Sequence, residues 1–377
     1  RDLVRSRGLG DVYKRQFKGP ARSGLFVFRW KGLRVVVKLS KLGVDKQANV
    51  ILGAGASRGA SCFDQTWAQS PLDTDFFDQI DRLKGTSTGK ILSELSEFAR
   101  DEFGVADSIR MEPFFTQLEA LNEFHASLKI DRGPRVRAFE KQLEKFPSYL
   151  AAIFASLRQI AGTQSLTCDH HEALAHALRA GDTVISLNYD CLMDEALKSK
   201  SGKSWSAHEG YGVPIESGES AWHDHSGRGR VAKNTIKLLK VHGSLNWMRT
   251  GSGPSISLRR DPYETCGRSK SEVVPPVWNK QVSADNTLAD IWKGARDSLR
   301  TGPILVVVGY SFPDTDLLTQ VLLRVATSES GKNLTHLILV NPDHEARRKA
   351  RYVLHQALTP KTSVIELKSW HELRQLF

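Results

Sequence analysis

The sequence lacks both long apolar runs and paired cysteines. No apolar run approaches the ~20 residues needed to span a bilayer, and the first residues carry no apolar core of a signal peptide. The four cysteines, Cys62, Cys168, Cys191 and Cys266, are widely separated and form no C-x-x-C pair. This spacing supports neither a disulfide framework nor a structural zinc site. We therefore expect a soluble, cytoplasmic protein without a zinc module.

Beyond its first fifty residues, the chain also lacks an excess of either charge. Residues 1–50 contain 13 Lys and Arg against 3 Asp and Glu, whereas residues 51–377 contain 40 against 39. The net charge of +11 is therefore almost entirely a property of the leading segment. A basic arm of this kind could bind nucleic acid, but we favour a segment outside the functional fold and do not expect a nucleic-acid partner.

The first sixteen residues, RDLVRSRGLGDVYKRQ, show no periodicity and resemble translated adapter sequence. We expect residues 1–16 to be a non-native leader and residues 17–46 to be a basic segment of uncertain status. Residues 47–377 are then expected to form a single domain.

Strands and helices alternate through this region. Short, nearly continuous apolar runs predict strands at residues 50–52, 183–187, 236–241, 304–308, 337–340 and 363–367. Apolar residues at helical spacing predict a large, mostly helical insertion over about residues 75–180, and shorter helices follow the later strands. The pattern predicts an α/β fold with a Rossmann-like, doubly wound parallel sheet.

The first predicted strand ends abruptly in the segment G-A-G-A-S at residues 53–57. Gly53 and Gly55 lack a Cβ, so the backbone can turn sharply and approach a ligand. Ser57 stands where a helix could begin, with N–H groups and a hydroxyl available to a phosphate. The full G-x-G-x-x-G fingerprint is absent, and no acidic residue ends a second strand about twenty residues on. This segment alone leaves nucleotide binding and a plain tight turn as open alternatives.

Small or polar clusters follow five predicted strands at the same relative position. They lie at residues 53–57, 188–190, 242–244 and 309–311 and at Asn341. The carboxyl ends of strands in an open parallel sheet converge on one crevice, where ligands bind. We therefore predict one ligand site built from these clusters, although each cluster alone could be an ordinary loop.

In this order, the clusters resemble sirtuin-like proteins of the zinc-free bacterial branch, which hydrolyses NAD in antiphage defence. The matching segments are G-A-G-A-S (53–57), P-L-D-T-D-F-F (71–77), N-Y-D (188–190), H-G-S-L-N-W (242–247), G-Y-S-F-x-D (309–314) and V-N-P (340–342). The resemblance spans about residues 47–345. Sirtuin deacylases carry a four-cysteine zinc module, which this sequence cannot build.

The resemblance implies how one end of NAD is held. The glycine turn on the NAD phosphates is matched by Gly53, Ala54, Gly55 and Ser57. Gly309 and Ser311 match the loop on the second phosphate and the adenosine ribose, and Asn341 matches the asparagine on the adenine-side ribose. Sirtuins follow the glycine turn with an Asp-Phe-Arg segment that is absent here, which leaves Arg58 as a candidate for phosphate contact.

At the nicotinamide end, the resemblance implies two catalytic residues. Asn188 matches the asparagine that positions the ribose or the attacking water, and His242 matches the histidine that contacts the ribose and serves as base. Asp190 matches the acid that holds the nicotinamide carboxamide. These residue types suit the chemistry. Nicotinamide leaves NAD as a neutral molecule, so the enzyme needs no acid to protonate the leaving group. A histidine with an unperturbed pKa of about 6.5 can accept a proton near neutral pH.

Three functions remain open, of which we favour the first. An NAD hydrolase would release nicotinamide and ADP-ribose, with NAD as its substrate, no metal, and a homo-oligomer or a separately encoded activator as partner. A sensor module would bind NAD or ADP-ribose without turnover. A protein deacylase is disfavoured by the missing zinc module and by the helical insertion.

The other histidines suggest no site of their own. His223 and His225 resemble a metal-binding pair, but no cysteine or carboxylate cluster accompanies them, so we do not expect a metal. His170, His171 and His176 lie around the start of a predicted helix, and we expect them at the surface.

Overall fold

The fold is described from a computed structural model of the chain. The structure describes residues 47–104, 109–128, 133–200, 204–222, 235–249, 255–264, 271–277, 286–329 and 334–377, which belong to one compact unit. The predictions for residues 1–16 and 17–46, and those for His223, His225 and Cys266, lie outside these residues.

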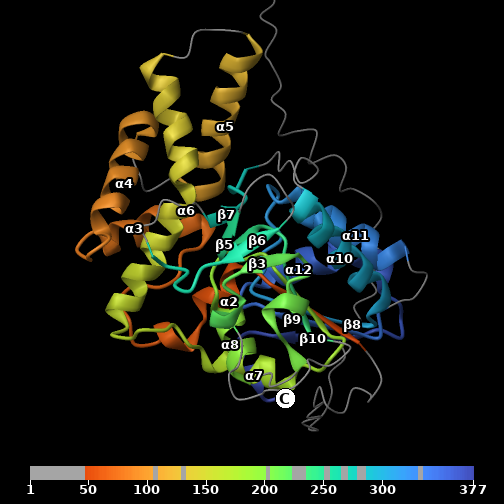
Figure 1. Cartoon of the computed structure of the whole chain (residues 1–377). Coiled ribbons are helices and arrows are strands. Elements are labelled where there is room, and N and C mark those ends of the chain that lie inside the picture. Colours follow the sequence, from red (N-terminus) through yellow and green to blue (C-terminus); the bar gives the residue numbers. More distant parts are fainter. Residues whose placement is uncertain are drawn as a thin grey trace, which may run out of the picture. The chain divides into compact units, whose positions relative to one another are not determined.

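A parallel sheet of six strands forms the centre of this unit (Figure 1). Its strands are β1 (Ala48–Leu52), β2 (Thr183–Ser186), β4 (Lys237–Lys240), β8 (Ile304–Val308), β9 (His336–Val340) and β10 (Ser363–Leu367). Every residue of β1, β2 and β8 is buried, which is why these strands read as apolar runs without alternation. The predicted α/β fold with a doubly wound parallel sheet is confirmed.

The strand order reverses direction at the middle of the sheet. In the order β10-β9-β8-β1-β2-β4, the chain moves outward on one side through β1, β2 and β4 and on the other through β8, β9 and β10. The switch point therefore lies between β1 and β8, whose last residues, Leu52 and Val308, are register partners. In open α/β sheets, ligands bind outside the carboxyl ends of the strands at such a point.

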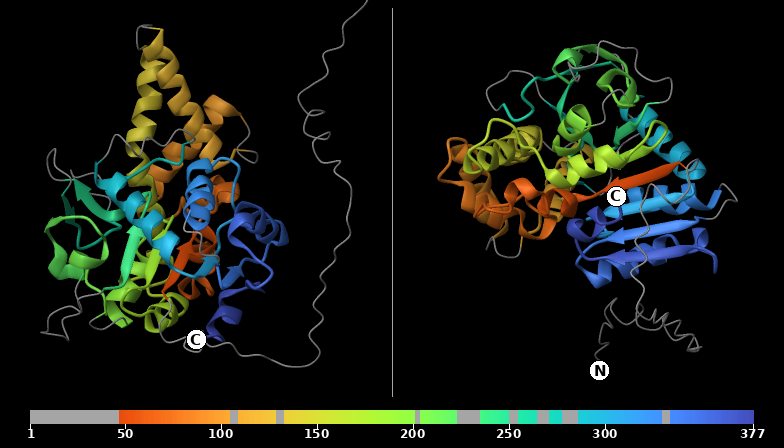
Figure 2. Two further views of the ribbon diagram at one scale, coloured as in Figure 1. Left: turned by 90° about the vertical axis from the view of Figure 1, so that its right-hand side faces the viewer. Right: turned by 90° about the horizontal axis from the view of Figure 1, so that it is seen from below.

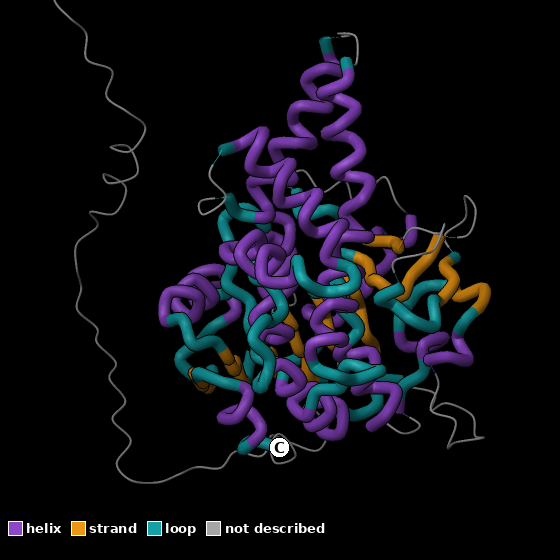
Figure 3. Tube along the Cα trace, turned by 90° about the vertical axis from the view of Figure 1, so that its left-hand side faces the viewer, coloured by secondary structure: helices purple, strands orange, loops and turns teal. Residues whose placement is uncertain are grey.

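The predicted helical insertion is confirmed between β1 and β2. Its helices are α3 (Phe76–Leu83), α4 (Gly89–Phe103), α5 (Met111–Ser127), α6 (Pro134–Ile160) and α7 (Asp169–Ala177). Edge-to-face phenylalanine pairs join them, including Phe77 with Phe114 and Phe115 with Phe146 at centroid distances of 5.2 and 4.7 Å. Helices α5 and α6 run side by side and extend away from the sheet (Figures 1 and 3).

The remaining helices pack around the sheet (Figure 2). Helix α10 (Asn286–Thr301) lies against β2 and β4, and α12 (His344–Val353) lies against β9. Helices α8 (Leu192–Lys200) and α13 (Trp370–Arg374) both contact α7, while α11 (Leu317–Glu329) packs on α10. None of the helices described here has both the length and the apolarity to cross a membrane.

A second, smaller sheet was not predicted. It has the order β3-β6-β5-β7 and consists of β3 (Ile215–Ser217), β6 (Ile256–Leu258), β5 (Gly243–Arg249) and β7 (Ser271–Val273). Three of these strands have only three residues and lie in polar segments, so no apolar run reveals them. The φ angle of Gly243 is +82°, and a Cβ there would lie 2.2 Å from the carbonyl oxygen of Glu272. Glycine therefore allows β5 to begin directly after His242 and beside β7.

Glycines also allow the turns after β1 and β8 to meet at the switch point. The N–H of Gly55 donates to the carbonyl of Gly309 over 2.8 Å, and the N–H of Gly53 donates to the carbonyl of Val308 over 2.9 Å. Gly309 has a φ of +65°, and a Cβ on it would lie 2.1 Å from the backbone nitrogen of Ala56. Two backbones therefore touch where any other residue would hold them apart.

We predict that Gly309→Ala is far more destabilising than Gly162→Ala. Both glycines have nearly equal φ angles, +65° and +64°, but an added Cβ at Gly162 has no neighbour within 4 Å. The backbone penalty of about 1 kcal/mol is common to both, whereas the clash at Gly309 should raise its loss of unfolding free energy to about 3 kcal/mol. Denaturant unfolding measures both values, and equal losses would contradict the tight contact between the two turns.

Candidate functional site

A cavity of about 670 Å³ opens at the carboxyl ends of the central strands. This volume lies in the range typical of small-molecule sites. All ten residues assigned to a site from the sequence line it: Gly53, Ala54, Gly55, Ser57, Asn188, Asp190, His242, Gly309, Ser311 and Asn341. The structure therefore gathers the five strand-end clusters around one space, as the strand-end pattern predicts.

The helical insertion and the C-terminal segment supply walls that the sequence did not indicate. Phe76, Leu150 and Phe154 form part of an apolar wall, and Trp370 and His371 contribute from the other end of the chain. Periodicity marked the insertion residues only as core positions. Nothing in the sequence shows which of them face a cavity.

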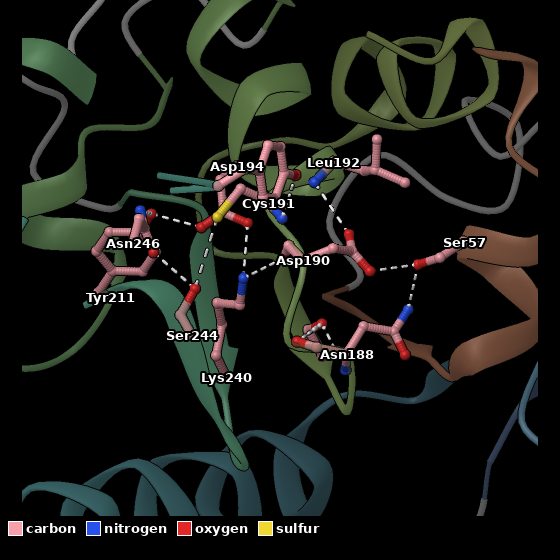
Figure 4. A network of polar contacts seen from close by, with 12 residues as sticks. Ser57, Asn188, Asp190, Cys191, Leu192, Asp194, Tyr211, Lys240, Ser244 and Asn246 are labelled. Carbon is pink, nitrogen blue, oxygen red and sulfur yellow. Dashed lines mark hydrogen bonds and ion pairs between the residues drawn. The ribbon is translucent and has the colours of Figure 1, made fainter. Parts of the chain in front are cut away.

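Ser57 joins the glycine turn to the loop after β2 (Figure 4). Its hydroxyl donates to Oδ2 of Asp190 over 2.6 Å and accepts a hydrogen bond from Nδ2 of Asn188 over 2.8 Å. The second amide hydrogen of Asn188 goes to the carbonyl of Gly53 over 3.0 Å. All three side chains are buried, so this small network fixes their relative orientation.

The position of Ser57 differs from the expectation that it begins a helix. Helix α2 (Ala54–Arg58) begins three residues earlier, because Gly53 takes an extended conformation and the chain turns at once. Ser57 therefore lies inside α2, where its hydroxyl is occupied by Asn188 and Asp190. The same carboxylate caps the next helix, since Oδ1 of Asp190 accepts from the N–H of Leu192 over 3.0 Å.

His242 is held in one orientation at the junction of the two sheets. Its Nδ1 lies 3.1 Å from the carbonyl oxygen of Leu187, which can only accept, so Nδ1 carries the hydrogen. In the neutral ring, Nε2 then carries the lone pair. The carbonyl of His242 accepts from the N–H of Val274 over 2.9 Å, and the centroid of its ring lies 6.2 Å from those of Tyr189 and Trp292. This imidazole is buried, fixed and in the tautomer that suits a base.

At the opposite end of the cavity, Asn341 connects the loops after β8 and β9. Its Nδ2 donates to the carbonyl of Tyr310 over 3.2 Å, and its Oδ1 accepts from the N–H of Asp343 over 3.0 Å. Ser311 is exposed beside it. These groups form a polar rim on the β8–β9 side of the switch point.

Arg58 ties the glycine turn to the segment at residues 71–77. Its guanidinium pairs with Asp75 and donates to the carbonyl of Ser70 over 2.8 Å. Burial, and then the charge of Arg82, lower the pKa of Arg58 below its ordinary value. The pair gives Asp75 a structural role in the segment after Pro71, because its carboxylate holds the arginine at the end of α2.

The expectation of three surface histidines is wrong for His171. His176 is exposed, but His171 is buried, and its ring packs 5.0 Å from that of Trp370. His170 lines the cavity and stacks on Trp370 at an interplanar angle of 11°. The indole N–H of Trp370 donates to the carbonyl of Ala56 over 3.0 Å, and this hydrogen bond joins α13 to α2.

In the part of the chain that the structure describes, no group of three or more His, Cys, Asp or Glu side chains is arranged to hold a metal ion. His223 and His225 lie outside that part, so the structure gives no account of them.

Comparison with protein families gives a match over the second half of the fold. A family described as SIR2-like domain matches residues 182–360, which contain β2, β4, β8 and β9 and the clusters that follow them. This match supports a sirtuin-like domain. A solved structure described as "Structural Basis for the Mechanism and Regulation of Sir2 Enzymes" aligns over 90% of this chain and 92% of that chain, with 14% sequence identity and a TM-score of 0.35. No curated protein matches the chain.

The thiol of Cys168, the residue before α7, should titrate near neutral pH. Burial alone raises the pKa of Cys168, but a hydrogen bond and the charge of His171 lower it to about 7. The N–H of Ser61 also points at its sulfur over 3.4 Å. The pKa values of Cys62 and Cys191 are instead raised, mainly by burial.

We therefore predict an ultraviolet thiolate transition with a midpoint at about pH 7. It should vanish in Cys168→Ser and persist in Cys62→Ser. Because the folded-state pKa is depressed, ionised Cys168 stabilises the fold above the pKa of the unfolded thiol, and this stabilisation is lost as the pH falls through about 7. A neutral-pH transition that survives Cys168→Ser would contradict the assignment.

Proposed function

We propose that this protein is an NAD hydrolase that cleaves the N-glycosidic bond between nicotinamide and ribose, releasing nicotinamide and ADP-ribose. The observation that carries the proposal is the convergence of Asn188 and His242 on one cavity at the switch point of the sheet. The SIR2-like match, whose family name points to NAD-dependent chemistry, covers both residues.

The cavity suggests how the dinucleotide would lie. The turn at Gly53, Ala54 and Gly55, beside Gly309, would lie along the two phosphates, since its glycines let the backbone approach a ligand closely. Asn341 and Ser311 would hold the adenine-side ribose. The nicotinamide end would then lie beside Asn188, Asp190 and His242.

The hydrogen bonds of Asn188 indicate what its amide would do. Gly53 and Ser57 take both amide hydrogens, so Oδ1 is the atom that can accept a hydrogen bond from a ribose hydroxyl or from water. His242, with its hydrogen fixed on Nδ1, would take a proton at Nε2. The apolar wall would limit bulk water around the ribose as positive charge develops on it.

The biological use that we propose is depletion of NAD during phage infection of a bacterial cell. Support for this use comes only from the resemblance of the strand-end motifs to sirtuin-like defence proteins. A separately encoded activator or self-assembly would then control the activity.

We predict that His242→Ala and Asn188→Ala each lower nicotinamide release from NAD by about 10²- to 10⁴-fold, because each removes a group that acts on the reacting atoms. Each variant, produced as a protein that begins near Lys46, is incubated with NAD, and the released nicotinamide is measured by chromatography. His176→Ala, which changes an exposed histidine, serves as the control and should retain the wild-type rate.

Wild-type rates in both site variants would contradict the catalytic assignment. If wild type releases no nicotinamide, calorimetry with ADP-ribose separates the remaining possibilities. Binding would indicate a sensor or an enzyme awaiting activation, and no binding would refute the nucleotide site. Release that rises well above the basal rate with an acetyl-lysine peptide would instead indicate a deacylase.

A further inference from the structure

A fully buried ion pair lies beside the loop that carries Asn188 and Asp190 (Figure 4). Nζ of Lys240 lies 3.0 Å from Oδ2 of Asp194, and neither side chain is more than 1% exposed. Lys240 is the last residue of β4, two positions before His242, and Asp194 lies in the first turn of α8. Removing two charges from water is costly, so such a pair calls for a reason beyond packing.

The pair belongs to a polar network that reaches into the second sheet. The hydroxyl of Tyr211 donates to Oδ1 of Asp194 over 2.5 Å and accepts from Nδ2 of Asn246 over 2.9 Å. Ser244 donates to Oδ1 of Asn246 over 2.6 Å. Asp194 is thus held from one side by Tyr211 and from the other by Lys240.

Lys240 remains charged in this setting. Burial alone would lower its pKa, but the opposing charges, with Asp194 first, raise the pKa above the ordinary lysine value. The ammonium therefore has three hydrogens to place, and Asp194 takes only one of them directly.

The ammonium also donates to the backbone carbonyl of Asp190. From Asp190 the contacts continue through Ser57 to Asn188. One buried cation therefore anchors the loop that carries Asn188 and Asp190, and the same strand end leads into His242. The loop lies between two fixed points, the glycine turn on one side and Lys240 on the other.

We propose that Lys240 is a positioning residue, whose ammonium fixes the carbonyl of Asp190 and thereby sets the amide of Asn188 toward the reacting ribose. This inference rests on the proposed function. Lys240 would contact neither substrate nor water. It would act only through the loop at residues 188–190.

The test must separate positioning from folding. Lys240→Met alone leaves the carboxylate of Asp194 buried without its partner, so that variant is expected to unfold easily. The double variant Lys240→Met with Asp194→Asn removes both charges and keeps an acceptor for Tyr211. It also removes the donor to the carbonyl of Asp190. Arg296→Met with Glu329→Gln removes an exposed ion pair between α10 and α11 and serves as the matched control.

We expect the Lys240/Asp194 double variant to fold with a thermal midpoint near that of wild type. Its kcat for NAD cleavage should fall about 10- to 100-fold, because a small displacement of a catalytic group causes a loss of rate of this size. Its affinity for ADP-ribose should change less than about threefold, because the phosphate turns are untouched. The control should match wild type in all three measurements. A wild-type kcat in the double variant would overturn the proposal, and so would a parallel loss of kcat, ADP-ribose affinity and thermal stability.

A second readout does not depend on turnover. Amide hydrogen exchange over residues 188–192 should be faster in the Lys240/Asp194 double variant than in wild type and the control. If wild type cleaves no NAD, the proposed function fails, but this exchange still tests the anchor. Equal exchange in all three proteins would overturn the positioning role.

Discussion

The contact between the turn after β1 and the turn after β8 is the constraint on which the site depends. Gly55 donates to the carbonyl of Gly309, and neither position tolerates a Cβ without displacing backbone atoms. Because these strands flank the switch point, the contact fixes the floor of the cavity. The polar clusters after β2, β4 and β9 surround that floor. The site is therefore a consequence of sheet order and of two backbones in direct contact.

Buried polar contacts then convert this floor into an ordered site. Ser57 connects the glycine turn to Asn188 and Asp190, and Lys240 holds the same loop from below. His242 receives its orientation from the carbonyl of Leu187, at the end of the neighbouring strand. Each group proposed to act on the nicotinamide ribose is held by protein atoms before any ligand binds. Such preorganisation lowers the cost of reaching the reactive arrangement.

The sequence predicted the central sheet because buried parallel strands leave unbroken apolar runs, as in β1 and β8. It predicted which residues gather around the cavity because strand ends converge in an open sheet. It missed the second sheet, since strands as short as β6 and β7 within polar segments leave no periodic signal. It misplaced His171, because burial of that ring depends on Trp370, about two hundred residues further along the chain. Contacts between distant segments, such as that of Lys240 with Asp190, also leave no local pattern.

The central claim is that one cavity binds NAD with its nicotinamide end beside Asn188 and His242. A crystal structure of the His242→Ala variant with NAD tests this most directly, because the variant should bind the dinucleotide without cleaving it. The account predicts intact NAD with its phosphates on the turns at Gly53 and Gly309, its adenine-side ribose at Asn341 and its nicotinamide ribose beside Asn188. NAD bound elsewhere, or bound with its two ends reversed, would contradict the account.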